Sequence, residues 1–291
     1  MAWRAFTTLK QRLTMIVEFT KMHGLGNDFV VIDAIRQEIS LTPEQIRFIA
    51  TRHFGVGCDQ LLLVELAAKH SDADFRYRIF NADGSEVAQC GNGARCFARF
   101  VRDKKLSYKD NILVDTHGGQ LLLSFDDDGL ITVNMGVPRH NPAIIPLRAE
   151  QEEKFYTVDV NGVEKAFGAV SMGNPHAVLK VSDVHLAQVS DVGEALESHP
   201  FFPERANIGF MQVIDRNNIK LRVYERGAAE TLACGSGACA AVVIGIEQKL
   251  LDQDVVVELP GGKLKIHWEG RENPVFMTGP AVSVFEGRIE I

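Results

Sequence analysis

The segment GACAAVVIGIEQK, residues 237–249, limits the possible folds more than any other part of the chain. Its pattern predicts a helix, and almost every position up to Glu247 is small or apolar. A helix of this kind has no face suited to water, so other parts of the protein must surround it. Strands wrapped around a central buried helix meet this requirement better than a surface helix on an open sheet. We therefore expect an α+β fold.

The start of this helix belongs to a motif that occurs twice. EVAQCGNGARCFARFV, residues 86–101, matches ETLACGSGACAAVVIG, residues 230–245, so that Cys90 corresponds to Cys234, 144 residues later. Glycine pairs and Gly-Asn turns recur at offsets of 143 and 147 residues: 118–119 with 261–262, and 24–28 with 172–176. The repetition predicts an ancient duplication with two pseudo-symmetric halves, each a β-barrel-like sheet wrapped around one central helix.

The remaining pattern is rich in strands. Short runs with β-branched and aromatic residues predict strands at 27–34, 60–66, 75–81, 111–117 and 119–125, and at 176–181, 207–214, 219–225, 254–260 and 263–268. Residues 42–53 are expected to form a helix, with Thr42 as N-cap and Pro43 in its first position.

Composition excludes several classes of protein. A net charge of −7, a pI near 5.7 and the lack of a Lys/Arg run argue against a nucleic-acid surface. No stretch reaches the roughly 18 apolar residues of a membrane helix, so we expect a soluble protein. Five cysteines form no disulfide framework and indicate a reducing cytoplasm. Residues 1–14 are interpreted as a nonessential N-terminal extension.

Each motif places a cysteine where a helix begins. The unpaired N–H groups and the positive end of the helix dipole favour a thiolate, which predicts a pKa lowered towards neutrality for Cys90 and Cys234. The glycines also allow a bound carboxylate to approach the backbone closely. Spacings of six residues from Cys90 to Cys96 and five from Cys234 to Cys239 fit no zinc site. We expect Cys58, Cys96 and Cys239 to be structural.

If the two motifs face each other across a cleft, two sulfurs address opposite sides of one carbon. One thiolate then removes a proton while the other thiol delivers one to the opposite face, which inverts a stereocentre. The helix ends would stabilise the negative charge that develops on a carboxylate. No glycine-rich dinucleotide motif is present, and we expect no cofactor and no metal.

The chain resembles the diaminopimelate epimerase family, the pyridoxal-phosphate-independent amino acid epimerases of lysine and peptidoglycan synthesis. The resemblance extends from Met15 to Ile291 and rests on KMHGLGNDF, GVGCDQ, NADGSEVAQCGNGARC, MGNPHAV, RANIGF and ERGAAETLACGSGA. It implies interconversion of LL- and meso-2,6-diaminopimelate. It also implies two similar halves, at 15–134 and 135–279, with a last strand at 280–291 that returns to the first half.

The resemblance also implies roles for particular residues. Cys90 and Cys234 would be the acid/base thiols, and His176 and Glu225 would tune them. Arg226 suits bidentate binding of a distal carboxylate, and Glu225 suits an ammonium group. The pocket would be lined by Asn27, Gln60, Asn81, Asn174, Asn207, Glu225 and Arg226, with backbone groups of Gly91, Asn92, Gly235 and Ser236 on the reacting carboxylate.

We expect a homodimer that acts on a small molecule, without a nucleic-acid or membrane partner. Two alternatives remain open at this point. A relative of the same fold acting on proline or hydroxyproline would use the same paired thiols. A non-enzymatic relative, or a redox-sensing binding module, would explain the thiols without the polar pocket, and a direct assay of stereoinversion distinguishes it.

Overall fold

The computed structural model describes residues 15–88 and 90–291, and the predicted extension at 1–14 lies outside the described residues. The described part contains eighteen strands and four helices. The first half contains β1 (Ile16–Gly24), β2 (Asn27–Asp33), α1 (Pro43–Ala50), β3 (Gln60–Leu66), β4 (Phe75–Asn81), β5 (Glu86–Val87), α2 (Gly91–Asp103), β6 (Asn111–Thr116), β7 (Gly119–Phe125) and β8 (Ile131–Asn134).

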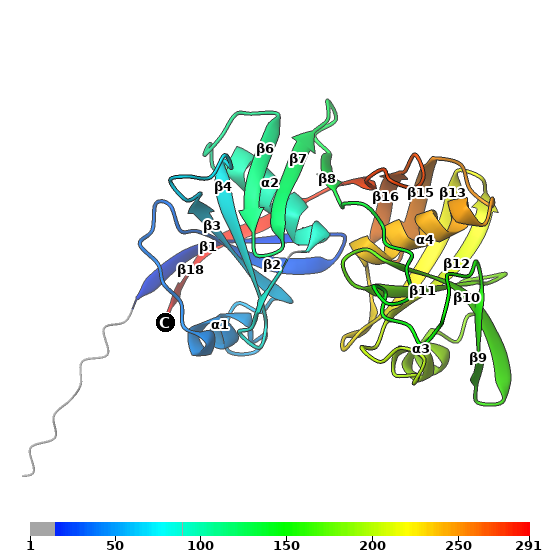
Figure 1. Cartoon of the computed structure of the whole chain (residues 1–291). Coiled ribbons are helices and arrows are strands. Elements are labelled where there is room, and N and C mark those ends of the chain that lie inside the picture. The colour runs from blue at the N-terminus through cyan, green and yellow to red at the C-terminus, as the bar shows by residue number, and fades with distance from the viewer. Residues whose placement is uncertain (1–14, 89) are drawn as a thin grey trace, which may run out of the picture.

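The rest of the chain repeats this series of elements. It contains β9 (Tyr156–Val160), β10 (Val163–Ser171), β11 (Pro175–Lys180), α3 (Val189–Glu197), β12 (Asn207–Asp215), β13 (Asn218–Glu225), β14 (Ala229–Thr231), α4 (Gly235–Glu247), β15 (Asp254–Leu259), β16 (Gly262–His267), β17 (Phe276–Gly279) and β18 (Val282–Glu290). The two groups of elements lie beside each other, one around α2 and one around α4 (Figure 1).

Strand pairing shows the symmetry of the two halves directly. In the first half the strands run in the order β18-β1-β2-β3-β4-β6-β7-β8, with β2/β3 and β4/β6 parallel. In the second half the order is β9-β10-β11-β12-β13-β15-β16-β17, with β11/β12 and β13/β15 parallel. The two orders correspond strand for strand.

The halves are joined at two places. β8 and β17 pair antiparallel, with Val133 opposite Met277, which makes one continuous sheet of both halves. The chain then crosses back, and β18 pairs antiparallel with β1 (Figure 1, red beside blue). β18 therefore occupies next to β1 the position that β9 occupies next to β10.

The two central helices form the inside of the molecule, as predicted. Nine of the thirteen residues of α2 and ten of the thirteen of α4 are buried. A single apolar core includes Phe97 and Val101 of α2 together with Val242 and Val243 of α4. The apolar sequence of α4 is thus explained by burial on all sides, and the expected α+β class with strands around central helices is confirmed.

The predicted strands agree with the structure to within one residue at each end, and the helix predicted at 42–53 begins as expected but ends early. Thr42 caps α1 by accepting a hydrogen bond from the N–H of Gln45, and Pro43 is its first residue. The helix ends at Ala50 rather than His53, because Thr51 turns extended and the N–H of Gly55 bonds back to the oxygen of Thr51. The paired glycines form hairpin turns as expected, with Gly119 at φ +113° and Gly262 at φ +140°.

Several elements escaped the sequence pattern. The sequence pattern did not predict the helix α3 or the strands β1, β5, β8, β9, β10, β14 and β17. The family resemblance implied β18 as a last strand at 280–291, but its own sequence shows no alternation because most of its side chains are exposed. Among the described residues, the structure contains no helix with the length and apolar character needed to cross a membrane.

Candidate active site

The two cysteine motifs meet at the centre of the molecule. Cys90 and Cys234 are the N-cap residues of α2 and α4, both with extended backbone dihedrals. A Cβ atom on Gly91 would lie 2.6 Å from Met277 Cε, and one on Gly235 would lie 3.0 Å from Met277 Sδ. One methionine side chain therefore packs against the first turn of both helices, and neither position has room for a larger residue.

A buried amide links the motifs directly. Asn92 Nδ2 donates to the backbone oxygen of Ala233 at 3.1 Å, and Ala233 immediately precedes Cys234. The same amide nitrogen donates to Asn27 Oδ1 at 3.3 Å. Asn92 thus connects the start of α2 to the residue before α4 and to the first hairpin turn, so its position controls the spacing of the two helix starts.

The surroundings of the two sulfurs differ. Cys90 is partly exposed, and its Sγ lies 3.7 Å from Asn27 Oδ1. Cys234 is only 4% exposed, and its Sγ accepts the N–H of Gly237 at 3.4 Å and lies 3.7 Å from Ser236 Oγ. The second thiol therefore contacts the open N–H groups of its helix, whereas the side chain of Cys90 makes no capping bond.

The expected lowering of the thiol pKa values is wrong for this structure. Burial raises the pKa of Cys90, although the N–H groups of Gly93 and Asn92 act in the opposite direction. Burial, followed by the negative charge of Glu225, raises the pKa of Cys234 well above its ordinary value. The N–H groups at the helix N-termini lower the thiol pKa values, as predicted. Desolvation of the thiolate raises these pKa values by more.

The other three cysteines are buried away from the motif starts. Burial raises the pKa of Cys58 to about 11 and that of Cys96 and Cys239 to about 12. A thiol of this kind is an apolar packing group and a poor nucleophile. Their surroundings agree with the structural role expected for them.

Glu225 is the carboxylate that acts on both thiols. It is the last residue of β13, and its Oε1 accepts a hydrogen bond from the hydroxyl of Thr231. Burial raises the pKa of Glu225. Its charge in turn contributes to raising the pKa of Cys90 and of Cys234.

Asn207 and Arg226 are held together at the end of the parallel β11/β12 pair. The Asn207 side chain donates to the oxygen of Pro175 at 3.1 Å and accepts the backbone N–H of Arg226 at 3.0 Å. The guanidinium of Arg226 donates to the backbone oxygen of Glu204 at 3.0 Å. Asn207 is 3% exposed, so its main contacts in this structure fix the backbone on which Arg226 stands.

A chain of polar side chains runs from His176 to Cys234. His176 Nε2 lies 3.0 Å from Asn174 Oδ1, and Asn174 Nδ2 donates to Ser236 Oγ at 3.4 Å. Because the partner of the ring is an amide oxygen, the proton must reside on Nε2. Burial, together with the charge of Arg226, lowers the pKa of His176 to about 3, so the ring is neutral near pH 7.

Gln60 and Asn81 face each other across β3 and β4. Gln60 Nε2 donates to Asn81 Oδ1 at 3.0 Å, and Asn81 Nδ2 donates to Ser85 Oγ at 3.3 Å. Within residues 15–88 and 90–291, no hydrogen bond joins either amide to a thiol. The structure therefore brings together Cys90, Cys234, Asn27, Asn92, Ser236, Asn174 and His176 through direct contacts, and leaves Gln60 and Asn81 as a separate amide pair.

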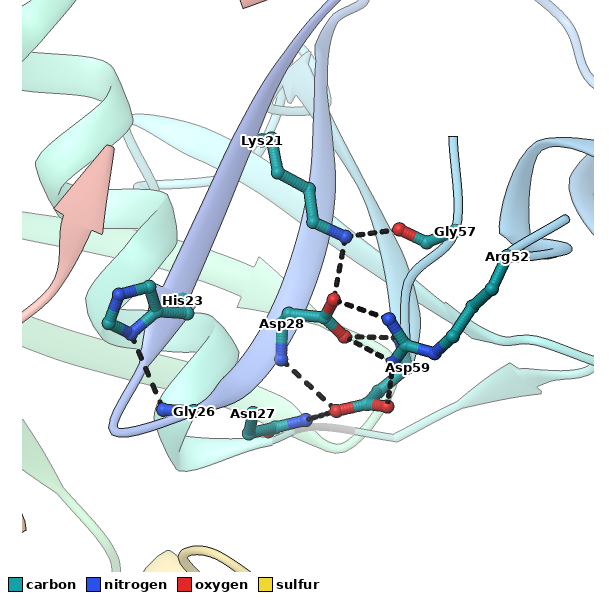
Figure 2. A network of polar contacts seen from close by, with 8 residues as sticks. All are labelled: Lys21, His23, Gly26, Asn27, Asp28, Arg52, Gly57 and Asp59. Carbon is teal, nitrogen blue, oxygen red and sulfur yellow. Dashed lines mark hydrogen bonds and ion pairs between the residues drawn. The ribbon is translucent and has the colours of Figure 1, made fainter. Parts of the chain in front are cut away.

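A charged network that the sequence did not reveal supports Asn27 (Figure 2). Arg52 forms a fork with both oxygens of Asp28, each at 2.9 Å, and reaches Asp59 at 2.7 Å. Lys21 Nζ donates to Asp28 at 2.7 Å. Burial opposes the charge of Asp28, but the hydrogen bonds from Arg52 and Lys21 hold its pKa well below the usual range.

This network fixes the orientation of the Asn27 amide. Asp59 Oδ2 accepts from Asn27 Nδ2 at 3.0 Å and from the N–H of Asp28 at 3.1 Å (Figure 2). With its nitrogen bound to Asp59, Asn27 presents its oxygen to Cys90 and Asn92. The four charged residues lie in the motifs KMHGLGND and GVGCD and in the preceding loop, but only the parallel pairing of β2 with β3 brings them together.

No group of three or more His, Cys, Asp or Glu side chains in the described part of the chain is arranged to hold a metal ion. The charges of Glu225 and Arg95 act on the pKa of Cys90, and that of Glu225 acts on the pKa of Cys234. The arrangement offers two thiols on two adjacent helix starts, with backbone N–H groups between them. Such a site can exchange protons with a small anionic molecule.

Comparison with known proteins identifies the family. A family model described as diaminopimelate epimerase matches residues 19–141 and 168–284. The diaminopimelate epimerase of Nitrosomonas europaea is 58% identical over 277 residues, which cover 95% of this chain and all of the relative. That of Thioalkalivibrio sulfidiphilus is 59% identical over 278 residues, with the same coverage. The chain belongs to the diaminopimelate epimerase family and is an isomerase.

Solved structures agree on the fold. A phenazine biosynthesis protein of the PhzF family from Bacillus anthracis superposes with a TM-score of 0.69 at 18% identity, over 95% of this chain and all of that chain. A hydroxyproline epimerase from Agrobacterium vitis also gives 0.69, at 14% identity, over 95% of this chain and 93% of that chain. At such low identity the likeness concerns the fold alone.

Proposed function

We propose that this protein interconverts LL- and meso-2,6-diaminopimelate, with Cys90 and Cys234 as the two groups that exchange protons with one carbon. The observation that carries the proposal is the contact between the two helix starts, each of which is capped by a cysteine. Asn92 bonds to Ala233, and Met277 packs on Gly91 and Gly235, which supports a single site that contains both thiols. The substrate follows from the relatives at 58% and 59% identity.

The proposed reaction is a balanced exchange of protons. One cysteine, as thiolate, takes the proton from the α-carbon, so a C–H bond breaks and an S–H bond forms. The electron pair stays on the carbon and is delocalised into its carboxylate. The other cysteine, as thiol, then gives its proton to the opposite face, and its S–H bond breaks while a new C–H bond forms. Configuration inverts, and nothing is oxidised or reduced.

Stabilisation of the carbanion is assigned to the two helix starts. Backbone N–H groups at Gly91, Asn92, Gly235 and Ser236 are among the first donors of α2 and α4 and have no partner within their helices. Two positive helix ends favour the negative charge that moves onto the carboxylate as the proton leaves. Their rigid connection through Asn92 keeps these donors in place, so little reorganisation is needed during the reaction.

The raised thiol pKa values have a consequence for this mechanism. At neutral pH both cysteines are protonated in the structure described, so one proton must leave when the reactive state forms. A thiolate that is buried and weakly solvated is a stronger base than an exposed one. We assign the tuning of this step to Glu225, which acts on both thiols, and to His176, which acts on Cys234 through Asn174 and Ser236.

The far end of the substrate carries a carboxylate and an ammonium group. We assign the carboxylate to Arg226, whose guanidinium can bind two oxygens at once, and the ammonium to Glu225. The amides of Asn27, Gln60, Asn81, Asn174 and Asn207 would complete the pocket without changing its charge. The fixed backbone of Arg226, held by Asn207, supports this assignment because a bidentate contact requires a defined orientation.

Purified protein incubated with LL-diaminopimelate tests the function. We expect meso product to appear until both isomers are present at equilibrium, and we expect no inversion of L-proline or trans-4-hydroxy-L-proline under the same conditions. Inversion of the cyclic amino acids in preference to diaminopimelate would replace the proposed substrate, and absence of inversion with all three would overturn the proposal.

We also propose that no pyridoxal phosphate and no metal take part. The negative charge at the carbanion is assigned to helix ends, so activity should survive dialysis, EDTA and hydroxylamine. Loss of activity on chelation that an added metal restores would overturn this part of the proposal.

The assembly and division of the chain are further parts of the proposal. A homodimer is supported by β18, an edge strand with exposed Val282, Val284 and Phe285, and sedimentation of the purified protein tests it.

The pairing of β18 with β1 supports one domain of residues 15–134 with 280–291 and another of 135–279. Five free cysteines support a reducing cytoplasm as the location.

A further inference from the structure

Arg95 lies in the interior of the protein, on the second turn of α2. Its side chain is 0% exposed and makes three contacts. Nη2 donates to Asn92 Oδ1 at 2.9 Å, Nε donates to the backbone oxygen of Pro280 at 3.2 Å, and Nη1 lies 3.5 Å from Met277 Sδ. A fully buried guanidinium is rare, and its burial costs free energy unless the charge is paired or hydrogen-bonded.

The charge of Arg95 has no carboxylate beside it among the described residues. The other arginines of the same helix are ordinary by comparison, since Arg99 pairs with Asp103 at 3.0 Å and Arg102 with Asp110 at 3.0 Å. Burial lowers the pKa of Arg95, because desolvation disfavours its charged form. Ion pairing therefore does not explain why an arginine is buried here.

The contacts of Arg95 are the groups that set the spacing of the two helix starts. Asn92 accepts from Arg95 on its oxygen and donates from its nitrogen to the oxygen of Ala233, next to Cys234. Met277 packs on the first residues of both helices. Pro280 begins the crossing back to the first half. One guanidinium thus connects the start of α2, the strand that touches both helix starts, and the return of the chain.

Two glycines leave the space that the guanidinium occupies. A Cβ on Gly24 would lie 3.1 Å from Arg95 Nη2, and a Cβ on Gly279 would lie 3.4 Å from its Nε. Gly24 ends β1 and Gly279 ends β17, so strands from both halves approach the same group. The planar fork of arginine, with donors in three directions, fits this position in a way that a lysine does not.

We propose that Arg95 is a positioning residue for the proton transfer: it fixes the two helix starts, and with them both thiols, relative to each other, and places a positive charge behind Cys90. The proposal rests on the proposed two-thiol function. The charge of Arg95 opposes the effect of burial on the pKa of Cys90, whereas the main influences on the pKa of Cys234 are burial, Glu225, Ser236 and Gly237. Loss of the charge should therefore affect Cys90 more than Cys234.

The test compares Arg95→Met, Arg95→Lys and the matched control Arg99→Met, which removes a partly exposed arginine of the same helix. Each variant is assayed with LL-diaminopimelate for kcat and KM. Alkylation of Cys90 and Cys234 by iodoacetamide is followed against pH by peptide mass spectrometry, and thermal unfolding monitors the fold.

For Arg95→Met we expect kcat to fall about 100-fold, with a much smaller change in KM, because a displacement of about 1 Å at the reacting groups has an effect of this size. Alkylation of Cys90 should begin at higher pH, and the profile of Cys234 should move less. Arg95→Lys should keep the Cys90 profile, since the charge remains, and should lose kcat by about 10-fold, since the fork is lost. Arg99→Met should match the wild type.

A folded Arg95→Met with wild-type kcat, an effect confined to KM, or an unchanged Cys90 profile would each overturn the proposal. If Arg95→Met does not fold, Arg95→Lys decides, and wild-type kcat in folded Arg95→Lys would contradict the positioning role. Absence of stereoinversion by the wild type would instead contradict the proposed function, and the alkylation profiles would still test the effect of Arg95 on Cys90.

Discussion

The two halves of the molecule have the same strand order but treat their cysteines differently. Cys90 is partly exposed and lies beside the amide of Asn27, and the charge of the buried Arg95 contributes to lowering its pKa. Cys234 is buried and accepts a hydrogen bond from an N–H of its own helix. After burial, the charge of Glu225 is the next largest cause that raises its pKa. Duplication thus supplied two equivalent helix starts, and the residues around them made the two thiols unequal.

This difference teaches how one site can hold an acid and a base of the same chemical type. Two thiols with identical surroundings would compete equally for one proton. Environments that raise one pKa more than the other favour one protonation state of the pair. By this argument Cys90 is the thiol that loses its proton more readily, and Cys234 is the thiol that retains it.

Removal of either thiol should have the largest effect. Cys90→Ala and Cys234→Ala should each lower turnover of LL-diaminopimelate by about 1,000-fold or more, because one face of the carbon loses its proton carrier. The control Cys58→Ala removes a buried thiol outside the site and should be mild. Near-normal turnover in either motif variant would show that the mechanism does not need two thiols.

Removal of the Glu225 charge should reduce the inequality of the thiols. Glu225→Gln should lower turnover by about 100-fold and shift alkylation of Cys234 to lower pH by more than that of Cys90. The sign follows from the cause: a negative charge raises a thiol pKa, so its loss lowers it. Glu230→Gln, whose carboxylate pairs with Arg222, is the control. Equal shifts of both thiols would contradict the assigned asymmetry.

Disruption of the network behind Asn27 should act on the Cys90 side. Asp59→Ala removes the acceptor that orients the Asn27 amide, and we expect kcat to fall about 10-fold through misplacement of the groups around Cys90. The mutation should cost about 1 kcal/mol of stability, since the ion pair with Arg52 is half exposed. Glu44→Ala breaks the exposed pair with Arg47 and should leave kcat unchanged. Identical kinetics for the Asp59→Ala and Glu44→Ala variants would contradict the role of Asp59 in orienting the Asn27 amide.

The last prediction concerns the pH dependence of stability on the Cys234 side, where little change in turnover is needed for the test. The pKa of His176 is lowered to about 3 in the folded protein from 6.5, so the unfolded chain binds more protons between these values. The resulting stability is present above pH 6.5 and is lost as the pH falls towards 3, at about 1.4 kcal/mol per pH unit at most. His176→Gln should flatten this dependence in urea unfolding at pH 4 to 7. A parallel dependence in both proteins would contradict a buried, neutral ring.

The sequence predicted the parts of the site that are local in the chain. A cysteine followed by glycines and an apolar helix defines an N-cap without further information, and the repetition of this motif predicts two such caps. The capping residues of α1 and the glycine hairpins are local in the same sense. These features depend on short-range backbone conformation, and for that reason they can be read from neighbouring residues.

The remaining features depend on which segments meet. Arg95, Arg99 and Arg102 look alike in GARCFARFVR, and only the enclosing sheet shows that one is buried and two are partly exposed. The thiol pKa values were predicted with the wrong direction because the helix end is visible in the sequence and the depth of burial is not. Only the family resemblance implied β18, because its position depends on β1, at the other end of the chain, and the local sequence does not show that pairing.

The most direct measurement for the two-thiol mechanism is the reaction in D₂O, followed at early times by mass spectrometry. Each cysteine exchanges its own proton with solvent, so the thiol that reprotonates the carbon delivers deuterium, and the proton that was removed stays on the opposite sulfur. We therefore predict meso product that carries one solvent deuterium while recovered LL substrate carries none. Product that retains the substrate hydrogen, or substrate that gains deuterium before product forms, would contradict two separate proton carriers.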